Sequence, residues 1–313
     1  MNRLYSPRRQ QAGTALVTAM LIVALASIAA TSMLKQQHID IRRAENMVRG
    51  DQLSLYIQAG ENWARSVLIR DKFENEYDSL AEDWAKLDEP LSLKDGRIQV
   101  KVEDLQGRYN LNNLLDEEGR LSKPDLQQFQ NLLVVLELDV ELATAILDWI
   151  DADVNPGLPA GAEDQDYLRL EKPYRAANAP FVSSSELLLV KGISREVFDK
   201  LEPYVTTLPL RGEVNVNTAT PAVLAAMISG MTLDEATSLV DGRPDKGYQD
   251  IATFRGEQAL SGREITGIGV SSRFFLVQVN VELGRYNAAR QSILARGEDD
   301  ELASFVQRSR TGL

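Results

Sequence analysis

The sequence predicts an α+β protein in which a long N-terminal helix crosses a membrane and then packs on a small antiparallel sheet. Three observations carry this prediction. An uncharged apolar segment lies near the N-terminus, strand-like alternation occurs at two places far apart in the chain, and the residues between those places have mostly helical patterns. The helical part is therefore expected to be a large domain inserted into the sheet.

The apolar segment, residues 14–34, has the length and composition of a membrane-spanning helix. It contains 21 residues, and no charged side chain occurs between Arg9 and Lys35. About 20 apolar residues cross a bilayer core of roughly 30 Å. A buried core helix is seldom this long without a charge, and a secretory signal has a shorter apolar region of roughly 7–15 residues, followed by a small-residue cleavage site. A transmembrane helix is therefore favoured.

The head before this helix is basic. Arg3, Arg8 and Arg9 are its only charged residues, and Gly13 ends it. Because positively charged flanks stay on the cytoplasmic side of a membrane, the head should be cytoplasmic and the rest of the chain should cross.

Beyond the membrane the helical pattern continues to about Arg70, and strands follow. No proline interrupts residues 35–70, where apolar residues recur among charged ones. The sequences GRIQVKVED, near residue 100, and FLVQVNVELG, residues 275–284, alternate apolar and polar side chains as half-buried strands do. A turn at Gly284 leads into a second, weaker strand of a hairpin. The charged tail from Gly297 is expected to be frayed.

The inserted helical part contains a repeated plan. SSELLLVKGISREVFDKLEPYV reads as helix, glycine hairpin, helix, and VNVNTATPAVLAAMISGMTLDEATSLVDGRP repeats it with Pro221 starting a helix and Gly230 turning it. These are helix-hairpin-helix-like (SAM-like) repeats, which in many proteins bind DNA phosphates through backbone amides. Phosphate binding needs cations. Lys191 is the sole cation near the first hairpin, and the net charge is −12. A packing module is favoured, and no nucleic acid is expected as a partner.

The acidic loop, residues 148–171, is the candidate metal site. Its DxDxN segment places oxygen ligands at alternate positions, as in the first half of a calcium loop, although Pro156 and Ala162 occupy positions where an EF-hand requires Gly and Glu. A second acidic run follows a Pro/Gly-rich crossing. The predicted oxygen ligands of Ca²⁺ are Asp151, Asp153, Asn155, Glu163, Asp164 and Asp166. The alternative is a hydrated acidic loop without a metal.

An enzymatic role for these carboxylates has less support. No nucleophile, phosphate loop or general-base histidine accompanies them. The only histidine, His38, lies just past the membrane segment, and the chain has no cysteine, which argues against zinc and thiolate chemistry. We therefore expect no catalytic residues. A membrane-tethered carboxylate hydrolase is the weakest interpretation, and a membrane-anchored DNA-binding receptor that uses the hairpin repeats is the principal alternative to an assembly subunit.

These features together resemble the type IV pilin-like proteins. Within that group the chain is similar to the protein K family of the type II secretion system, the largest minor pseudopilins. The resemblance covers nearly the whole chain, and its motifs are QQAGTALVTAMLIVALAS, DLQGRYNLNNL, LDWIDADVNPGLPAGAEDQDYL, PFVSSSELLLVKGIS and VNVNTATPAVLAAM. The acidic-loop and VNVNTAT motifs are the specific ones.

The resemblance implies a role in assembly. It implies a subunit that forms or initiates the tip of the periplasmic pseudopilus, which helps to export folded proteins across the outer membrane. Its partners would be minor pseudopilins I and J and the pseudopilus below them. The protein would pass the bacterial inner membrane once, with its N-terminus in the cytoplasm and its body in the periplasm. The resemblance also implies two bound calcium ions.

Processing is implied as well. A prepilin peptidase would cut between Gly13 and Thr14, and Thr14 would then be N-methylated. A residue without Cβ allows the close backbone approach that a peptidase needs. The chain would thus be divided into a cleaved leader (1–13), a transmembrane helix (14–34), a stalk helix with the first strand (35–109), an inserted α-helical domain (110–270), a returning hairpin (271–296) and a C-terminal tail (297–313).

Thr18 would be the fifth residue of the mature chain, where most pilin-like subunits carry a glutamate. A buried charge is tolerable only when it is paired, whereas a threonine hydroxyl can bond to the backbone four residues back. Thr18 alone can equally be an ordinary small residue of a membrane helix. Together with a bulky inserted domain, it indicates a subunit that occurs once per fibre, at the end.

Overall fold

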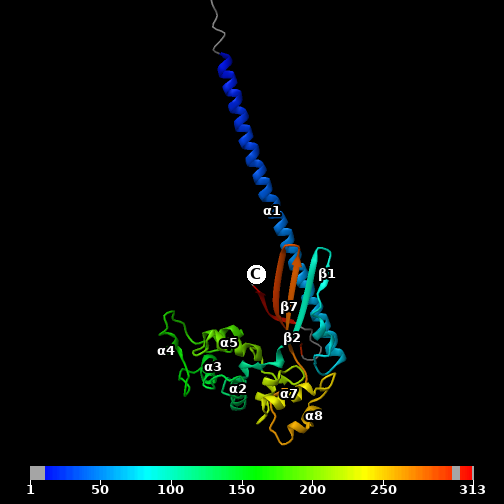
Figure 1. Cartoon of the computed structure of the whole chain (residues 1–313). Coiled ribbons are helices and arrows are strands. Elements are labelled where there is room, and N and C mark those ends of the chain that lie inside the picture. The colour runs from blue at the N-terminus through cyan, green and yellow to red at the C-terminus, as the bar shows by residue number, and fades with distance from the viewer. Residues whose placement is uncertain (1–10, 298–303, 312–313) are drawn as a thin grey trace, which may run out of the picture.

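The structure, a computed structural model, describes residues 11–297 and 304–311. A single long helix, α1 (Gln11–Glu74), dominates its shape (Figure 1). At 1.5 Å per residue, its 64 residues extend about 96 Å. The side chains of residues 14–34 are all exposed, and the most apolar window of the helix has a mean hydropathy of 2.2. This helix is long and apolar enough to cross a membrane.

The second half of α1 packs on a five-stranded antiparallel sheet. The strands lie in the order β1 (Leu91–Leu93), β2 (Gly96–Asp104), β7 (Phe274–Leu283), β8 (Tyr286–Ala295) and β9 (Ser304–Thr311). Val100 pairs with Val279 at the centre of the sheet. At Gly60 of α1 an added Cβ would lie 2.8 Å from Cγ1 of Val279. The glycine therefore lets the helix approach the sheet closely.

The apolar core under α1 follows the periodicities seen in the sequence. The helix contributes one face, and the strands contribute the alternate residues that point toward it. The buried members from these elements include Leu53, Ile57, Leu68, Ile98, Val100, Val102, Val277, Val279 and Val281. The predicted strand near residue 100 and the predicted hairpin near residues 275–296 are thus present as β2, β7 and β8.

The tail differs from the expectation. Residues 304–311 form β9, which pairs along β8 with an irregularity between Ile293 and Leu294. Phe305 packs partly buried against the core beneath α1. The expectation of a frayed tail was therefore wrong for these residues. The reason is that β8 would otherwise present unpaired backbone groups at the sheet edge.

The chain between β2 and β7 forms a separate, mostly helical domain with its own apolar core (Figure 1). Two short parallel strand pairs connect its segments: β3 (Tyr109–Asn110) pairs with β4 (Val205–Thr206), and β5 (Val214–Asn215) pairs with β6 (Ile268–Gly269). Short 3₁₀ helices (η) connect its elements, and a further one, η1 (Asp83–Lys86), lies outside this domain, before β1. The other elements of the domain, in chain order, are η2 (Leu105–Gly107), β3 (Tyr109–Asn110), η3 (Leu111–Leu114), α2 (Lys123–Val135), α3 (Leu142–Ile150), α4 (Asp164–Tyr167), η4 (Ser184–Leu189), α5 (Arg195–Leu201), η5 (Glu202–Tyr204), β4 (Val205–Thr206), β5 (Val214–Asn215), α6 (Pro221–Met227), α7 (Leu233–Asp241), α8 (Ile251–Arg255), η6 (Gln258–Leu260) and β6 (Ile268–Gly269).

The helix-hairpin-helix plan is visible in this domain. Gly192 and Gly230 have φ values of +87° and +67°, which L side chains rarely adopt, and each turns the chain between two helical segments. Thr220 caps α6, and Pro221 occupies its first turn. A long apolar N-terminal helix, a small antiparallel sheet and an inserted helical domain confirm the predicted α+β fold.

Candidate calcium site in the acidic loop

The acidic loop brings three carboxylates together between two helices. α3 ends at Ile150, so Asp151 and Asp153 follow directly, and Glu163 lies immediately before α4. Ligand oxygens of Asp151, Asp153 and Glu163 all lie within 4.8 Å of one another. Glu163 is buried, with 3% of its surface exposed, whereas Asp153 is exposed. The site is therefore open on one side.

Buried oxygens in this group lack protein donors. Within the described residues, Oδ1 of Asp151 and both carboxylate oxygens of Glu163 are buried without a hydrogen-bond partner. Burial, followed by repulsion from Asp148 and Asp151, raises the pKa of Glu163 to about 7. Burial and the charges of Asp153 and Asp148 raise the pKa of Asp151 to about 6. A hard divalent cation would satisfy these oxygens and offset the repulsion, and Ca²⁺ prefers such all-oxygen ligands.

Asp148 positions the loop around this group. It lies on α3, is 2% exposed, and its Oδ2 accepts a hydrogen bond of 2.9 Å from the backbone N–H of Gly157. At Gly161 an added Cβ would lie 2.2 Å from the same oxygen and 2.4 Å from the backbone of Gly157. Only a glycine fits there. The sequence offered a signal for Asp148, three residues before Asp151, but it did not distinguish a ligand from a residue that orders the loop.

The structure gives the other three predicted ligands different partners. The backbone N–H of Asn155 donates to Oδ1 of Asp153 at 2.7 Å. Asp164 accepts a bond of 3.1 Å from the backbone N–H of Ala176. Asp166 accepts one of 3.1 Å from Lys191, which lowers its pKa. Three of the six residues are thus brought together, and ligand roles for Asn155, Asp164 and Asp166 stay predictions.

The contact between Lys191 and Asp166 also bears on the hairpin repeats. Lys191 is the cation nearest the first hairpin, and its ammonium is paired with the carboxylate of Asp166, although the side chain is exposed. Arg195, at the start of α5, pairs with Asp199 at 2.9 Å. In the first hairpin, both of these cations are therefore paired with carboxylates, which weakens the case for phosphate binding.

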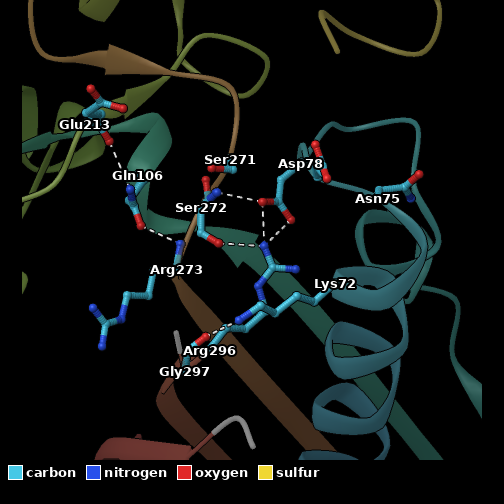
Figure 2. Close-up of a pocket in the computed structure, with 11 residues that line it drawn as sticks. Lys72, Asn75, Asp78, Gln106, Glu213, Ser271, Ser272, Arg273, Arg296 and Gly297 are labelled. Carbon is cyan, nitrogen blue, oxygen red and sulfur yellow. Dashed lines mark hydrogen bonds and ion pairs between the residues drawn. The ribbon is translucent and has the colours of Figure 1, made fainter. Parts of the chain in front are cut away.

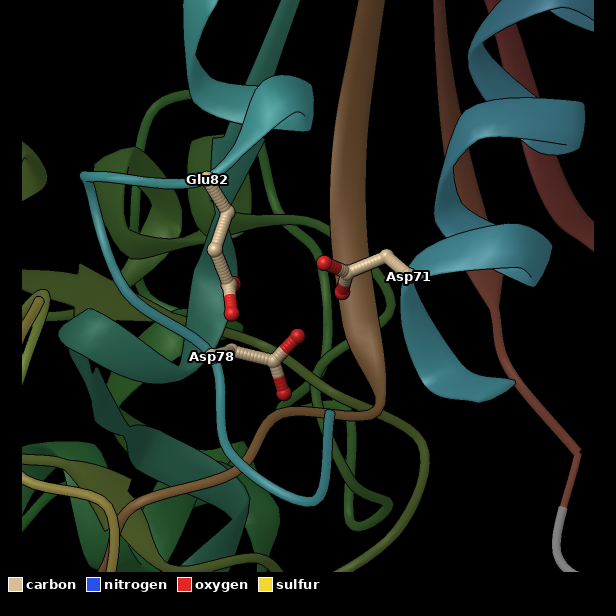
Figure 3. Close-up of side chains that lie close together, drawn as sticks. All are labelled: Asp71, Asp78 and Glu82. Atoms are coloured by element: carbon tan, nitrogen blue, oxygen red, sulfur yellow. The ribbon is translucent and has the colours of Figure 1, made fainter. Parts of the chain in front are cut away.

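A second carboxylate cluster, at the end of α1, was missed from the sequence. Asp71, Asp78 and Glu82 direct their carboxylates toward one another (Figure 3). Arg296 donates to Asp71 at 3.0 Å and also bonds Asp78. The guanidinium of Arg296 thus bonds two of the three carboxylates, while Oε1 of Glu82 is buried without a hydrogen-bond partner among the described residues. Asp71, Asp78 and Arg296 form a buried ion pair network. The three carboxylates lie within 12 residues, but Arg296 is more than two hundred residues away, so no local pattern in the sequence reveals the network.

The processing and tip residues lie near the start of α1. Gly13 and Thr14 are helical and exposed, and an added Cβ at Gly13 would meet nothing within 4 Å. The hydroxyl of Thr18 donates to the backbone oxygens of Thr14 and Ala15, each at 3.0 Å, as predicted for a self-satisfied threonine. Residues 1–10 of the predicted leader, including its three arginines, lie outside the described residues.

Comparison with known proteins identifies the family. Two family profiles, both described as type II secretion system (T2SS) protein K, match residues 107–210 and 214–271. Type II secretion system protein K of Pseudomonas aeruginosa is 36% identical over 94% of this chain and 92% of its own length. The chain belongs to the type II secretion system protein K family. The protein K of Aeromonas hydrophila is 32% identical over 94% of this chain and 96% of its own length.

The fold of this protein K family member is also found in a solved structure. A chain from the crystal structure of the GspK–GspI–GspJ complex of the type 2 secretion system of enterotoxigenic Escherichia coli superposes with a TM-score of 0.77. The match covers 87% of the protein K chain described here and all of that chain, at 24% identity. At this identity, the likeness shows the fold alone. Both family profiles lie within the inserted helical domain, which includes the acidic loop.

Proposed function

We propose that this protein is a non-enzymatic minor pseudopilin that forms or initiates the tip of the periplasmic pseudopilus, together with minor pseudopilins I and J. In this role it helps to export folded proteins across the outer membrane. One observation carries the proposal. The inserted domain lies at the end of α1 opposite the exposed apolar segment, beyond the sheet (Figure 1). A fibre built through apolar helices would have this domain at its end, where it would block the addition of another subunit.

The partners follow from chemistry and from the related complex. The exposed apolar residues of α1 need either lipid or other apolar helices around them, and a fibre of pilin-like subunits supplies both in turn. The solved relative is part of a complex with GspI and GspJ. We expect tagged protein extracted from inner membranes to bring down minor pseudopilins I and J. DNA binding at low salt without those partners would instead support the membrane-anchored receptor.

Processing should occur between Gly13 and Thr14. Gly13 has open surroundings, so the absence of a Cβ there serves no packing role within this chain. The bare backbone at Gly13 is instead accessible to a peptidase. We expect the intact mass of the membrane-extracted protein to lack residues 1–13 and to carry one additional methyl group. Gly13→Glu should retain the head. Gly50 lies in the same helix with equally open surroundings, so Gly50→Glu is the matched control and should be processed normally. A mass that corresponds to cleavage after Ala29 or Ala30 would identify an ordinary secretory signal.

Calcium is proposed as a structural cofactor of the inserted domain. Asp151, Asp153 and Glu163 would hold it, and an ion bound there would link the end of α3 to the start of α4. The unpartnered buried oxygens of Asp151 and Glu163 support this proposal. A second ion would draw on Asn155, Asp164 or Asp166, and the carboxylates of Asp164 and Asp166 would then share their oxygens between the metal and their present partners.

A further inference from the structure

The inserted domain and the stalk have separate apolar cores. The core beneath α1 and the core of the inserted domain share no residue, and a small cluster of Leu105, Leu208, Phe274 and Ala295 lies between them. A polar cavity of about 570 Å³ borders the same junction (Figure 2). The chain crosses here twice, after β2 and before β7. The apolar area buried at the junction is therefore small, and apolar packing alone does little to fix the orientation of the inserted domain relative to the stalk.

A buried asparagine from the VNVNT motif joins the two crossing segments. Asn215, with 0% exposure, donates from its side-chain amide to Oδ2 of Asp104 at 3.1 Å and to the hydroxyl of Ser272 at 2.9 Å. The same nitrogen lies 3.0 Å from the backbone oxygen of Asp78, so its two N–H groups are shared among three acceptors. The hydroxyl of Thr218 also donates to Asp104. One turn of the inserted domain thus contacts the end of β2, the segment before β7 and the loop after α1.

Arg296 extends this network to the stalk helix. It follows β8 and donates to Asp71 at the end of α1. It also donates to Asp78 in the next loop and to the backbone oxygen of Ser272 (Figure 2). Asp78 in turn accepts a bond of 2.6 Å from the backbone N–H of Ser272. All of these side chains are buried. A rotation of the inserted domain would leave several of these groups desolvated without partners, which is costly.

We propose that this network is a lock that holds the inserted domain in one orientation relative to the stalk helix. The lock consists of Asp71, Asp78, Asp104, Asn215, Ser272 and Arg296, and the VNVNT turn is its inserted-domain half. A subunit locked in this way transmits a push along α1 to the inserted domain as a rigid body, without bending at two peptide crossings. The lock itself does not depend on the proposed place at the tip.

The chain has no cysteine, so pairs of spin labels can be introduced without background. One pair spans the junction, with Asn62→Cys on α1 and Thr237→Cys on α7. The other pair, Asn62→Cys and Asn280→Cys, stays within the stalk and sheet. All three positions are exposed. Double electron–electron resonance of the full chain in detergent should give one narrow distance distribution for each pair.

Breaking the lock should broaden only the pair that spans the junction. We expect Asn215→Ala or Arg296→Met to at least double the width of the Asn62–Thr237 distribution while the Asn62–Asn280 distribution stays unchanged. Asn217→Ala is the matched control. Asn217 is equally buried and lies in the same motif, but its side chain bonds Tyr248 inside the inserted domain. It should leave both widths unchanged.

Two results would overturn the lock. The first is a junction-spanning distribution that stays as narrow in Asn215→Ala and Arg296→Met as in the unmodified chain, which would assign the orientation to the small apolar cluster. The second is an unchanged junction-spanning width in Thr218→Val, the variant to use if Asn215→Ala and Arg296→Met broaden both pairs, which signals unfolding. Thr218→Val removes one hydroxyl at nearly constant volume. Broadening across the junction in Thr218→Val supports the lock, and an unchanged width contradicts it.

Discussion

Removal of calcium with EGTA should lower the melting temperature of the protein by roughly 5–10 °C. A ligand that binds only the folded state stabilises it by about 2.7 kcal/mol at a hundredfold excess over Kd, and 1 kcal/mol shifts the melting temperature of a 150–250-residue protein by about 2–4 °C. This stabilisation would arise because a bound metal would satisfy the buried oxygens of Asp151 and Glu163, which have no hydrogen-bond partner among the described residues. Differential scanning calorimetry at fixed pH, with and without EGTA, measures the shift.

Ligand variants separate a specific site from a general effect of acidic residues. Asp153→Ala and Glu163→Gln should melt at the same temperature with and without EGTA. Glu171→Gln is the control, because Glu171 lies in the same acidic loop, is exposed and is not a predicted ligand. It should keep the full response. Identical melting curves of the unmodified protein with and without EGTA would remove the calcium claim.

Replacement of Arg296 by methionine should lower the free energy of unfolding by about 3–5 kcal/mol, because a buried ion pair that loses one partner leaves an uncompensated charge. Asp71 and Asp78 are 6% and 1% exposed and would remain close together without their guanidinium. Chemical denaturation at pH 8 measures the change. Arg97→Met, which breaks an exposed pair with Glu282, is the control and should cost far less, because water screens an exposed pair. A loss for Arg296→Met no larger than for Arg97→Met would contradict this account.

The same cluster gives the unmodified protein a pH dependence. Burial, followed by repulsion from Glu82 and Asp78, raises the pKa of Asp71 from 3.8 to about 7. Between these values the folded state binds more protons than the unfolded state, so the free energy of unfolding should fall as pH rises from about 4 to about 7. Burial raises the pKa of Asp104 to about 6, which acts in the same direction.

Asp71→Asn tests the origin of this slope. An amide does not titrate, so the variant should lose part of the decrease in stability between pH 5 and pH 7.5, while Asp104 retains its share. Denaturation midpoints across this range measure the slope. A pH profile that is the same for Asp71→Asn and the unmodified protein would assign the dependence to other groups.

Periodic patterns in the sequence predicted most of the fold. The apolar run and its continuation predicted α1, and alternating valines predicted β2 and β7, because each pattern reflects one buried face of a local element. β9 was not predicted. Its short sequence, SFVQRSRT, follows a charged segment, and its place in the sheet depends on the open edge of β8. The strand structure of β9 is thus determined by its pairing with β8, and the composition of β9 itself does not indicate a strand.

The two carboxylate clusters show how far site prediction can go. Asp151, Asp153 and Glu163 lie within 13 consecutive residues of one loop, and its DxDxN pattern and second acidic run brought them to attention. Asp71 and Arg296 are more than two hundred residues apart, and only the return of β8 beside α1 joins them. Asn215 appeared in a specific motif without a role, because its partners lie in segments that meet only in the folded chain.

The copy number of this protein per fibre tests the tip assignment most directly. Purified pseudopili can be quantified by mass spectrometry with isotope-labelled peptides from the inserted domain and from the major pseudopilin. Since the inserted domain would block further stacking, we expect about one copy per fibre beside many copies of the major subunit, with antibody labelling confined to one end. Protein repeated along the length of the fibres would contradict the tip assignment.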